Sequence, residues 1–363
     1  MPSWRISNEL EEALWAAAKL QLPERATRRK SLVPAIARRS ALYTIERDEL
    51  EREPSRGDSA DLAARALFFT LADAAKVKIP IAELVSSGGL PASRRLRVLD
   101  VGAGCGAMTL GLSDALSSAE LDVLALDRDA DALRLFSNAV KHLGRPSLAV
   151  ETRAGNLLGK LIGDAAAADL ILCGSVLNEM DEAKAFGLVT KLLEKLTADG
   201  SLIIIEPALR DSSRRLHRLR DRLIEERLGN IFAPCTRSAA PCPALALERD
   251  WCHEDRAFEA TPRLAALTNA TGMRAHRLKF AYLVVTRRDL ALSPGPSLLR
   301  IVSSLKKSKG KSELHVCGDD GWQKLRLQKR DRTDRNREFE RAQRGQLLEV
   351  GDGSYTVHDP AAS

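Results

Sequence analysis

Short apolar segments alternate with amphipathic segments from about residue 97 onward, and this alternation restricts the fold more than any other feature. The apolar segments are LRVLDVG, LDVLALD, ADLILCGSVL and SLIIIEP. Stretches with helical periodicity, such as DADALRLFSNAVKHLG and AKAFGLVTKLLEKLTADG, separate them. Strands that alternate with helices predict a parallel sheet covered by helices on both faces. We assign this α/β domain to residues 93–292 and expect MRAHRLKFAYLVVTR, near 273–287, to supply a closing strand pair.

The first 92 residues are predicted to be helical. The stretch SADLAARALFFTLADAAKV, with Ser59 as a plausible N-cap, has apolar residues at helical spacing. These are Ala64, Leu67, Phe68, Leu71 and Ala75. The segment SSGGLPAS at 86–93 interrupts the pattern and predicts a boundary.

Two further regions follow from the sequence. Residues 207–262 form an insertion in the α/β domain, which opens with the basic amphipathic helix RDSSRRLHRLRDRLIEERL and continues into a cysteine-bearing segment. The segment LSPGP at 292–296 predicts a second boundary. Residues 297–363 then form a basic module, in which alternating residues around a Gly-Asp turn indicate a small β structure.

The basic charge is concentrated in one segment. The chain has a net charge of +7, and residues 300–345 contain fourteen Lys or Arg against seven Asp or Glu. The rest of the chain is therefore close to neutral. A basic surface confined to one module indicates a polyanion partner such as nucleic acid, although a merely solvated charged face has the same composition.

Composition and the first residues predict a cytoplasmic protein without a membrane segment. The longest apolar runs are far too short to cross a bilayer. Glu9, Glu11 and Glu12 argue against an acid-poor transit peptide. Cysteines stay reduced in the cytoplasm, so clustered thiols are expected to be metal ligands rather than disulfides.

A glycine motif follows the first strand. The stretch LDVGAGCGAMTLGL contains Asp100, Gly102, Gly104 and Gly106, and Asp127 ends the next strand. Glycines allow a sharp turn and a close approach to a ligand, and a carboxylate after the second strand can accept hydrogen bonds from ribose hydroxyls. A dinucleotide-binding fold shares this last feature.

The spacing Asp-x-Gly-x-Gly-x-Gly resembles motif one of the Rossmann-like S-adenosylmethionine-dependent methyltransferases. The resemblance implies a Rossmann-like class I methyltransferase fold. The three glycines would then face the methionine end and the sugar, and Asp127 would bind the ribose. Asn156, in AGNLL, follows the third strand, where the family often has an acidic residue that contacts adenine. Cys105 and Cys173 are expected to be packed residues of the loop and the sheet.

The fourth strand ends in SVLNEM, which places Ser175, Asn178 and Glu179 where ligands bind in such sheets. Asn178 and Glu179 are the candidate catalytic residues; the alternative is that they only cap the next helix. The stretch differs from the Asn/Asp-Pro-Pro-aromatic motif of many amino-group methyltransferases. The residues therefore leave methyl transfer open.

Three of the six cysteines lie in one Pro-rich stretch, here named the cysteine loop (residues 233–253). Cys235, Cys242 and Cys252 are seven and ten residues apart, and Cys317 follows 65 residues later. The alternatives are packed core cysteines, a zinc site with Cys317 or His253 as fourth ligand, and an iron–sulfur cluster. Zinc fingers usually pair ligands two to four residues apart, a spacing that this set lacks. Soft thiolates suit either metal, so chemistry alone leaves both open.

The stretches EPALRDSSRRLHRLRDRLI, IFAPCTRSAAPCPALALERDWCH, SVLNEM and HVCGDDGW together resemble the mitochondrial small-ribosomal-subunit assembly family of methyltransferase-like proteins and its bacterial relatives. The resemblance covers about residues 60–345 and implies a four-iron cluster (4Fe-4S), with Cys235, Cys242, Cys252 and Cys317 as ligands. Relatives often carry histidine after Cys-Pro, where this chain does not. His253 is then expected to lie beside the metal site or to face RNA.

One cluster would join the basic module to the α/β domain and hold two sets of basic residues on one phosphate-binding face. The insertion helix supplies Arg214, Arg215, Arg218 and Arg220. The module supplies Lys324, Arg326, Lys329, Arg330, Arg332, Arg335 and Arg337. Aromatic residues make up only 4% of the chain, which favours shape and phosphate contacts on structured RNA.

Two functions are consistent with these features. One is an rRNA methyltransferase, and the other is a non-catalytic assembly factor that binds small-subunit rRNA. The expected partners are this rRNA and the small ribosomal subunit, with neither DNA nor a membrane.

Overall fold

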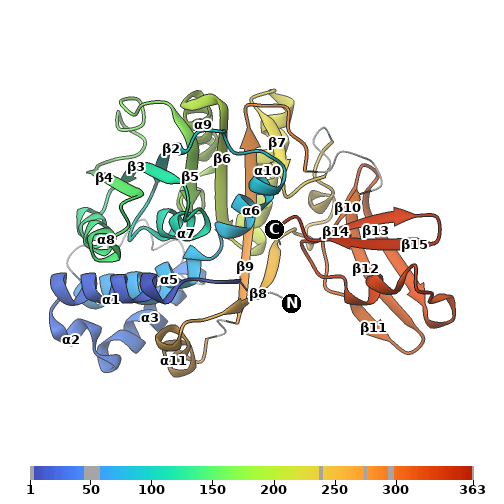
Figure 1. The fold of residues 1–363 in the computed structure, drawn as a ribbon, viewed down its shortest axis with the longest axis horizontal. Helices are drawn as coiled ribbons and strands as arrows, with labels where there is room; N and C mark the ends of the chain where they lie inside the picture. The colour runs from blue at the N-terminus through green and yellow to red at the C-terminus, as the bar shows by residue number, and fades with distance from the viewer. Residues whose placement is uncertain (1–3, 45–57, 237–239, 274–275, 293–297, 362–363) are drawn as a thin grey trace.

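The computed structural model describes residues 4–44, 58–236, 240–273, 276–292 and 298–361 (Figure 1). A central sheet lies between two layers of helices, and a second sheet, formed by the C-terminal residues, lies beside it (Figure 1). Most of the boundary predicted at 292–296 lies outside the described residues.

Five parallel strands form one end of the central sheet, in the order β4-β3-β2-β5-β6 with β4 at the edge. They are β2 (Arg95–Val101), β3 (Glu120–Asp127), β4 (Leu148–Ala154), β5 (Ala168–Gly174) and β6 (Leu196–Pro207). The order reverses between β2 and β5, which is the topological switch point where α/β sheets bind ligands. The predicted Rossmann-like class I methyltransferase fold is confirmed.

The remaining strands extend the sheet beyond β6. They are β9 (Arg277–Thr286), β8 (Glu254–Glu259), β7 (Asn230–Ala233) and β1 (Trp4–Arg5). β9 is antiparallel to β6, while β7 and β8 both pair with β9. The predicted insertion is therefore partly built into the sheet. The expectation of a strand pair within 273–287 is wrong, because the partner of β9 comes from before helix α11 (Pro262–Thr271).

Each face of the sheet has its own hydrophobic core. One face packs against α7 (Ala107–Ala115), α8 (Ala130–Leu143) and the N-terminal helices. The other face packs against α9 (Glu182–Glu194) and α10 (Arg210–Glu225). In α9, Ala185, Leu188, Val189 and Leu192 recur at helical spacing and are all buried.

The N-terminal region is helical, as predicted. Its elements are α1 (Asn8–Gln21), α2 (Glu24–Thr27), α3 (Arg29–Thr44), α4 (Ser59–Ala64), the π-helical turn η2 (Arg65–Phe69), α5 (Thr70–Ala74) and α6 (Lys78–Ser86). The apolar residues predicted to face the core are buried. The predicted N-cap is wrong by one residue: Asp58 caps α4, and its carboxylate accepts hydrogen bonds from Ala60 and Asp61.

The C-terminal module is an antiparallel sheet, in the order β11-β12-β10-β14-β15 with β13 paired to β12. Its strands are β10 (Leu298–Ile301), β11 (Lys306–Ser308), β12 (Lys311–Gly318), β13 (Gly321–Gln328), β14 (Leu347–Gly351) and β15 (Ser354–His358). The predicted turn is confirmed, because Gly318 pairs with Gly321 across Asp319 and Asp320. Ile301, Val316 and Phe339 belong to a core of its own.

A buried ion pair joins this module to the rest of the protein. Arg300 of β10 and Glu83 of α6 are 3% and 0% exposed, and Arg300 Nη1 lies 2.9 Å from Glu83 Oε1. The hydroxyl of Tyr282 in β9 donates to the other oxygen of Glu83 at 2.7 Å. Arg300 also donates to the carbonyls of Pro234, at 2.8 Å, and Gly345. One guanidinium group thus contacts the N-terminal helices, the cysteine loop and the module.

We expect Arg300→Met to lower the free energy of unfolding by about 3–5 kcal/mol, because the substitution leaves the Glu83 carboxylate buried and unpaired. Arg95→Met is the control, since Arg95 is 69% exposed in its pair with Glu120 and should contribute less than about 1 kcal/mol. Urea unfolding followed by tryptophan fluorescence measures both. Equal losses in the two variants would contradict a special role for Arg300.

Candidate functional site

The glycine loop joins β2 to α7 at the carboxyl edge of the sheet. Gly102, Gly104 and Gly106 have φ values of 72°, 52° and 88°, a region that residues with side chains rarely adopt. A Cβ at Gly102 would lie 2.2 Å from Val176, and one at Gly106 would lie 2.1 Å from the ring of Phe136. At Gly104 the nearest atom would be 3.9 Å away. Packing thus requires the first and third glycines, whereas the second borders open space.

Asp100 lies under this loop and is fully buried. Its Oδ2 accepts hydrogen bonds from the amide of Thr109 at 3.2 Å and from its hydroxyl at 2.6 Å. Its Oδ1 has no hydrogen-bond partner among the described residues. Burial raises the pKa of Asp100 to about 6. A buried carboxylate oxygen that lacks a donor is expected where a ligand or a water molecule supplies one.

Asp127 and Asn156 follow the next two strands of the sheet, as predicted. Asp127 accepts hydrogen bonds from the amides of Gly104 and Asp129, both at 2.8 Å. Burial raises its pKa. Asn156 is exposed, and its side-chain oxygen accepts from the amide of Leu158 at 2.9 Å. Asp127 is therefore fixed beside the glycine loop, whereas Asn156 caps a turn at the rim.

The N-terminal helices contribute an arginine to this edge that the sequence analysis did not identify. Arg65 Nη2 lies 2.5 Å from Asp129 Oδ2, and Arg65 Nε lies 3.2 Å from Asp61 Oδ2. Asp61 also binds Arg39, at 2.7 Å and 2.5 Å. The sequence feature that could have identified Arg65 is its spacing from Asp61, four residues away on a predicted helix. The helical region thus has an electrostatic connection to the loop that follows β3.

Asn178 and Glu179 lie on the short helix η3 (Leu177–Glu179) after β5, but they contact different strands. Asn178 Nδ2 donates to Glu206 Oε2 at 2.7 Å, and the other oxygen of Glu206 accepts from the Leu177 amide at 2.9 Å. Glu179 lies 3.4 Å from Arg128, next to Asp127, and burial raises its pKa. Asn178 therefore points toward the end of β6, and Glu179 toward the end of β3.

The interpretation of Asn178 and Glu179 as caps of the next helix is wrong. Asp181 caps α9, because its carboxylate accepts the amide of Lys184 at 2.8 Å. Ser175, just before η3, has a φ of 58°. Such a conformation is strained for a residue with a side chain, and strain of this kind gathers at functional sites.

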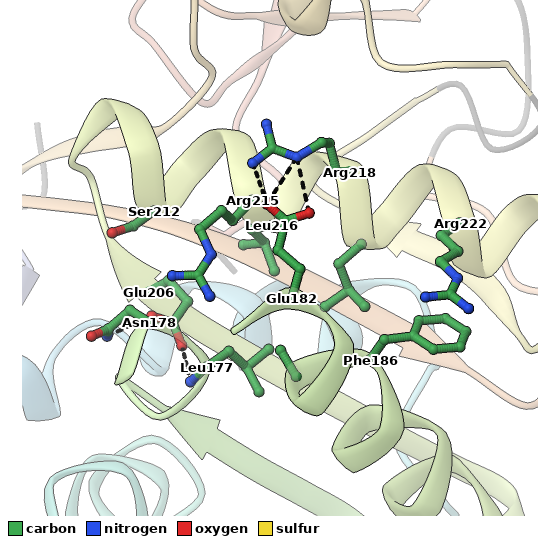
Figure 2. A pocket seen from close by; sticks show the side chains of 12 residues that line it. Leu177, Asn178, Glu182, Phe186, Glu206, Ser212, Arg215, Leu216, Arg218 and Arg222 are labelled. Atoms are coloured by element: carbon green, nitrogen blue, oxygen red, sulfur yellow. Dashed lines mark hydrogen bonds and ion pairs between the residues drawn. The ribbon is translucent and has the colours of Figure 1, made fainter. Parts of the chain in front are cut away.

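A groove that encloses about 100 Å³ lies between α9 and α10 and includes Asn178 in its lining (Figure 2). Arg215, Arg218 and Arg222 of α10 line it. Pairs of residues three and four apart lie on one face of a helix, which explains why these arginines share the groove.

The opposite face of α10 holds the cysteine loop. Arg214 donates to three backbone carbonyls of this loop at 2.7–3.0 Å, those of Ala244, Leu247 and Asp250. Arg220 is 1% exposed and donates to the Ala240 carbonyl at 2.9 Å. The prediction that Arg214 and Arg220 form part of a phosphate-binding face is therefore wrong, because protein groups already occupy both guanidinium groups.

Two cysteines of the loop are anchored on α10 through their backbone. The amide of Cys242 donates to the carboxylate of Asp221 at 3.0 Å and 2.9 Å. The amide of Cys252 donates to Nε2 of His217 at 3.1 Å. Burial lowers the pKa of His217 to about 4, so its ring is neutral and can accept this bond.

Cys317 reaches the cysteine loop from strand β12 of the C-terminal module. The hydroxyl of Thr236 donates to the Cys317 carbonyl at 3.1 Å. Burial, together with contributions from the nearby Cys235 and Cys317, raises the pKa of Cys252 to about 12. Burial raises the pKa of Cys242 as well, with contributions from Cys235 and Cys252. The four predicted ligands thus share one neighbourhood.

The structure does not show these thiols gathered around one point. Within the described residues, no three Cys, His, Asp or Glu side chains have the arrangement of a metal site. All six cysteines are free, and Cys105 and Cys173 are buried as predicted. Four soft thiols suit iron or zinc as a donor set, so the metal site stays a prediction.

His253 lies between the cysteine loop and the C-terminal module. Its ring stacks on Trp251 with centroids 5.9 Å apart, and Nη1 of Arg344 lies 3.3 Å from its ring nitrogens. Trp251 in turn donates to the Ala208 carbonyl at 3.2 Å. Of the two predicted roles, these contacts favour packing beside Cys252 over exposure to RNA.

The predicted cations of the C-terminal module are exposed, and some are paired. Lys324 and Arg326 lie 2.9 Å and 3.0 Å from Glu313. Hydrogen bonds from Lys311 and these two residues lower the pKa of Glu313 to about 2. The other predicted cations are also exposed: Lys329, Arg330, Arg332, Arg335 and Arg337. The surface remains basic around this ion-paired centre.

A comparison with models of protein families identifies the family to which this chain belongs. Residues 86–352 match the family described as mitochondrial small ribosomal subunit Rsm22. This chain belongs to the Rsm22 family.

Solved structures similar to this Rsm22-family chain include methyltransferases at low identity. A magnesium protoporphyrin IX methyltransferase from Synechocystis PCC 6803, with bound SAM, is 15% identical, with 69% of this chain and 95% of that chain covered and a TM-score of 0.38. The plantazolicin methyltransferase BamL is 13% identical, with coverage of 70% and 100% and a TM-score of 0.41. An O-methyltransferase family protein from Burkholderia thailandensis is 17% identical, with coverage of 68% and 63% and a TM-score of 0.35.

No curated protein matches this Rsm22-family chain. Among the helices in the described part of the chain, none has the length and apolar character needed to span a bilayer.

Proposed function

We propose that this Rsm22-family chain is a methyltransferase-like protein that binds S-adenosylmethionine and acts on the small ribosomal subunit. The main support is the glycine loop, where Gly104 borders open space beside Asp127. The loop would bind the methionine end, Asp127 the ribose, and Asn156 the adenine edge. The missing donor at Asp100 Oδ1 fits a ligand with ammonium or water-bridged contacts.

The sheet supports this cofactor over a dinucleotide. Both cofactor classes use a carboxylate after the second strand, so Asp127 does not distinguish them. The classic dinucleotide sheet continues with parallel strands in the order 3-2-1-4-5-6. Here β9 runs antiparallel beside β6. The chain therefore departs from the dinucleotide arrangement at the strand that follows the fifth parallel one.

We expect saturating S-adenosylmethionine to raise the melting temperature of the protein and Gly104→Ala to abolish this shift. The added methyl group would intrude on the ligand rather than on the protein. The left-handed conformation should cost the variant about 1 kcal/mol in stability. Gly144→Ala is the control, because Gly144 also has a positive φ, 61°, and its Cβ would meet no atom within 4 Å. It should lose similar stability but keep the shift. An unshifted wild type would contradict the cofactor site.

We further propose that Cys235, Cys242, Cys252 and Cys317 hold a 4Fe-4S cluster, with zinc as the alternative. The support is the shared neighbourhood of four free thiols. A cluster bound there would link the cysteine loop to β12 covalently through metal–sulfur bonds and contribute to folding. The thiols must move closer together to ligate one centre. The contacts of Arg300 and Thr236 hold the two segments in place for this.

Protein purified without oxygen should be brown and contain iron and sulfide, and Cys317→Ser should lose most of the metal. Cys105→Ala, which alters a packed cysteine outside the loop, should keep it. Because Arg300 and Thr236 join the module to the loop without metal, Cys317→Ser should keep the compact shape in small-angle scattering. Stoichiometric zinc in a colourless protein would reject the iron assignment. Absence of both metals would reject the site.

The proposed partner is small-subunit rRNA, with no role for DNA or a membrane, and the proposed location is cytoplasmic. The exposed cations of the C-terminal module support contacts with phosphates. Methyl transfer and a purely structural role in assembly are both compatible with this partner. The bond from Asn178 to Glu206 favours the structural role, because it engages the amide that would otherwise face an acceptor base.

Loss of the gene should lower the amount of mature small subunits relative to large ones. Mapping of rRNA methyl groups with and without the gene then separates the two roles. A methyl group that disappears, and that returns with the wild type but not with Asp127→Ala, would assign catalysis. An unchanged methyl pattern with fewer subunits would assign assembly. Normal subunits and normal methylation together would contradict the proposed function.

A further inference from the structure

The groove between α9 and α10 combines an apolar surface with a row of arginines. The space that it encloses, about 100 Å³, is smaller than a typical small-molecule pocket, so a ligand would lie along the groove rather than be enclosed by it. Figure 2 shows Arg215, Arg218 and Arg222 along α10, opposite the side chains of α9 and η3. The apolar lining consists of Leu177, Ala185, Phe186, Leu216 and Leu219.

The three arginines differ in how far other protein groups already compensate their positive charges. Arg218 pairs with Glu182 at 2.5 Å. Arg222 lies over the ring of Phe186, 3.5 Å from its centroid, and pairs with Glu226 at 2.7 Å. Arg215 donates to the Met180 carbonyl, and none of the ion pairs among the described residues includes it. Its charge is compensated less directly than those of Arg218 and Arg222, because its interaction with Glu182 is not a close ion pair.

This combination fits a nucleic-acid strand better than other anions. A guanidinium group binds phosphate oxygens through paired hydrogen bonds, and the arginines span about 10 Å along α10. Arg222 already covers one face of the Phe186 ring, so a base would lie on the Arg222 guanidinium plane or against the adjacent leucines. A single strand can present a phosphate and one unstacked base to such a groove, whereas the bases of a duplex are paired and stacked inside it.

The position of the groove determines where a bound nucleic-acid strand would end. Asn178 and Glu206, at the carboxyl ends of β5 and β6, line the groove together with Arg215. Figure 2 shows the Arg215 guanidinium near these two residues and the Arg222–Phe186 stack farther along the groove. A strand that follows the arginines from Arg222 to Arg215 therefore ends at η3.

We propose that the α9–α10 groove binds a single-stranded RNA segment, with a backbone phosphate at Arg215 and one base against the Arg222–Phe186 stack. The proposal rests on the proposed function only in taking RNA as the partner. It differs from that function in assigning single-strand contacts to α10, separate from the contacts of the C-terminal module.

Fluorescence anisotropy with the full chain and a labelled single-stranded RNA oligonucleotide tests the groove. We expect Arg215→Gln to weaken binding about tenfold, the usual effect of losing a charged hydrogen bond. The slope of log K against log salt should fall by about 0.7, as expected for one lost phosphate contact on a single strand. Arg222→Gln, at a half-exposed position, should act in the same direction without risk to the fold. Phe186→Leu should weaken binding of the oligonucleotide but not of its abasic counterpart.

Arg210→Gln is the matched control. Arg210 is exposed on the same helix, pairs with Asp211 and does not line the groove. Equal effects of Arg210→Gln and Arg215→Gln would overturn the proposal, since they would show a general charge effect. Tighter binding of polyglutamate than of RNA, lost in Arg215→Gln, would overturn it in favour of an acidic protein partner.

A second measurement on the same samples separates this proposal from the proposed function. The melting shift with S-adenosylmethionine and the affinity for a structured small-subunit rRNA fragment report on the cofactor site and the C-terminal module. If both persist while Arg215→Gln leaves single-strand binding unchanged, only the groove proposal fails. If both are absent while the single strand binds through Arg215, only the proposed function fails.

Discussion

The ion pair between Glu83 and Arg300 is the interaction on which the arrangement of the whole chain depends. Taking both charges out of water is costly, and only close contact with further hydrogen bonds offsets that cost. Here Tyr282 and the carbonyls of Pro234 and Gly345 provide these bonds. Arg300 also lies opposite Cys317 in the pairing of β10 with β12, while Pro234 precedes Cys235. The same guanidinium group therefore positions two distant cysteines without a metal, so a metal at the proposed site would reinforce this junction rather than create it.

Helix α10 shows how a single amphipathic helix can serve two purposes when both of its faces are polar. Arg214, His217 and Arg220 lie on one face, where they bind backbone groups or carboxylates of the cysteine-loop region. Arg215 and Arg222 lie on the other face, toward α9. Spacings of three and seven residues keep the members of each set on one side of the helix, whereas adjacent residues such as Arg214 and Arg215 point to different sides. The helix thus connects the packing of the cysteine loop to the shape of the groove.

Sequence patterns predicted the parts of the fold that depend on local periodicity. The strands from β2 to β6, the glycine loop and the hairpin at Gly318 follow from spacing and from turn chemistry. The pairing of β7 and β8 with β9 did not, because their partner lies distant in sequence and their own patterns are short. The burial of Arg220 and Arg300 was equally unpredictable. An arginine is normally exposed, and only partners supplied by other segments make its burial tolerable.

The turn η3 is where the two candidate sites meet. Glu179 faces Arg128 and the cofactor-side carboxylate of Asp127, whereas Asn178 faces Glu206 and the groove. The strained φ of Ser175 and the bond from its amide to Ile205 fix the start of this turn. Because β2 and β5 are neighbours across the switch point, a ligand at the glycine loop and a strand in the groove would approach η3 from opposite sides. Transfer between them would need the Asn178–Glu206 bond to open, whereas a role in assembly would leave it closed. The state of this one hydrogen bond in an RNA complex therefore distinguishes an enzyme from a scaffold in physical terms.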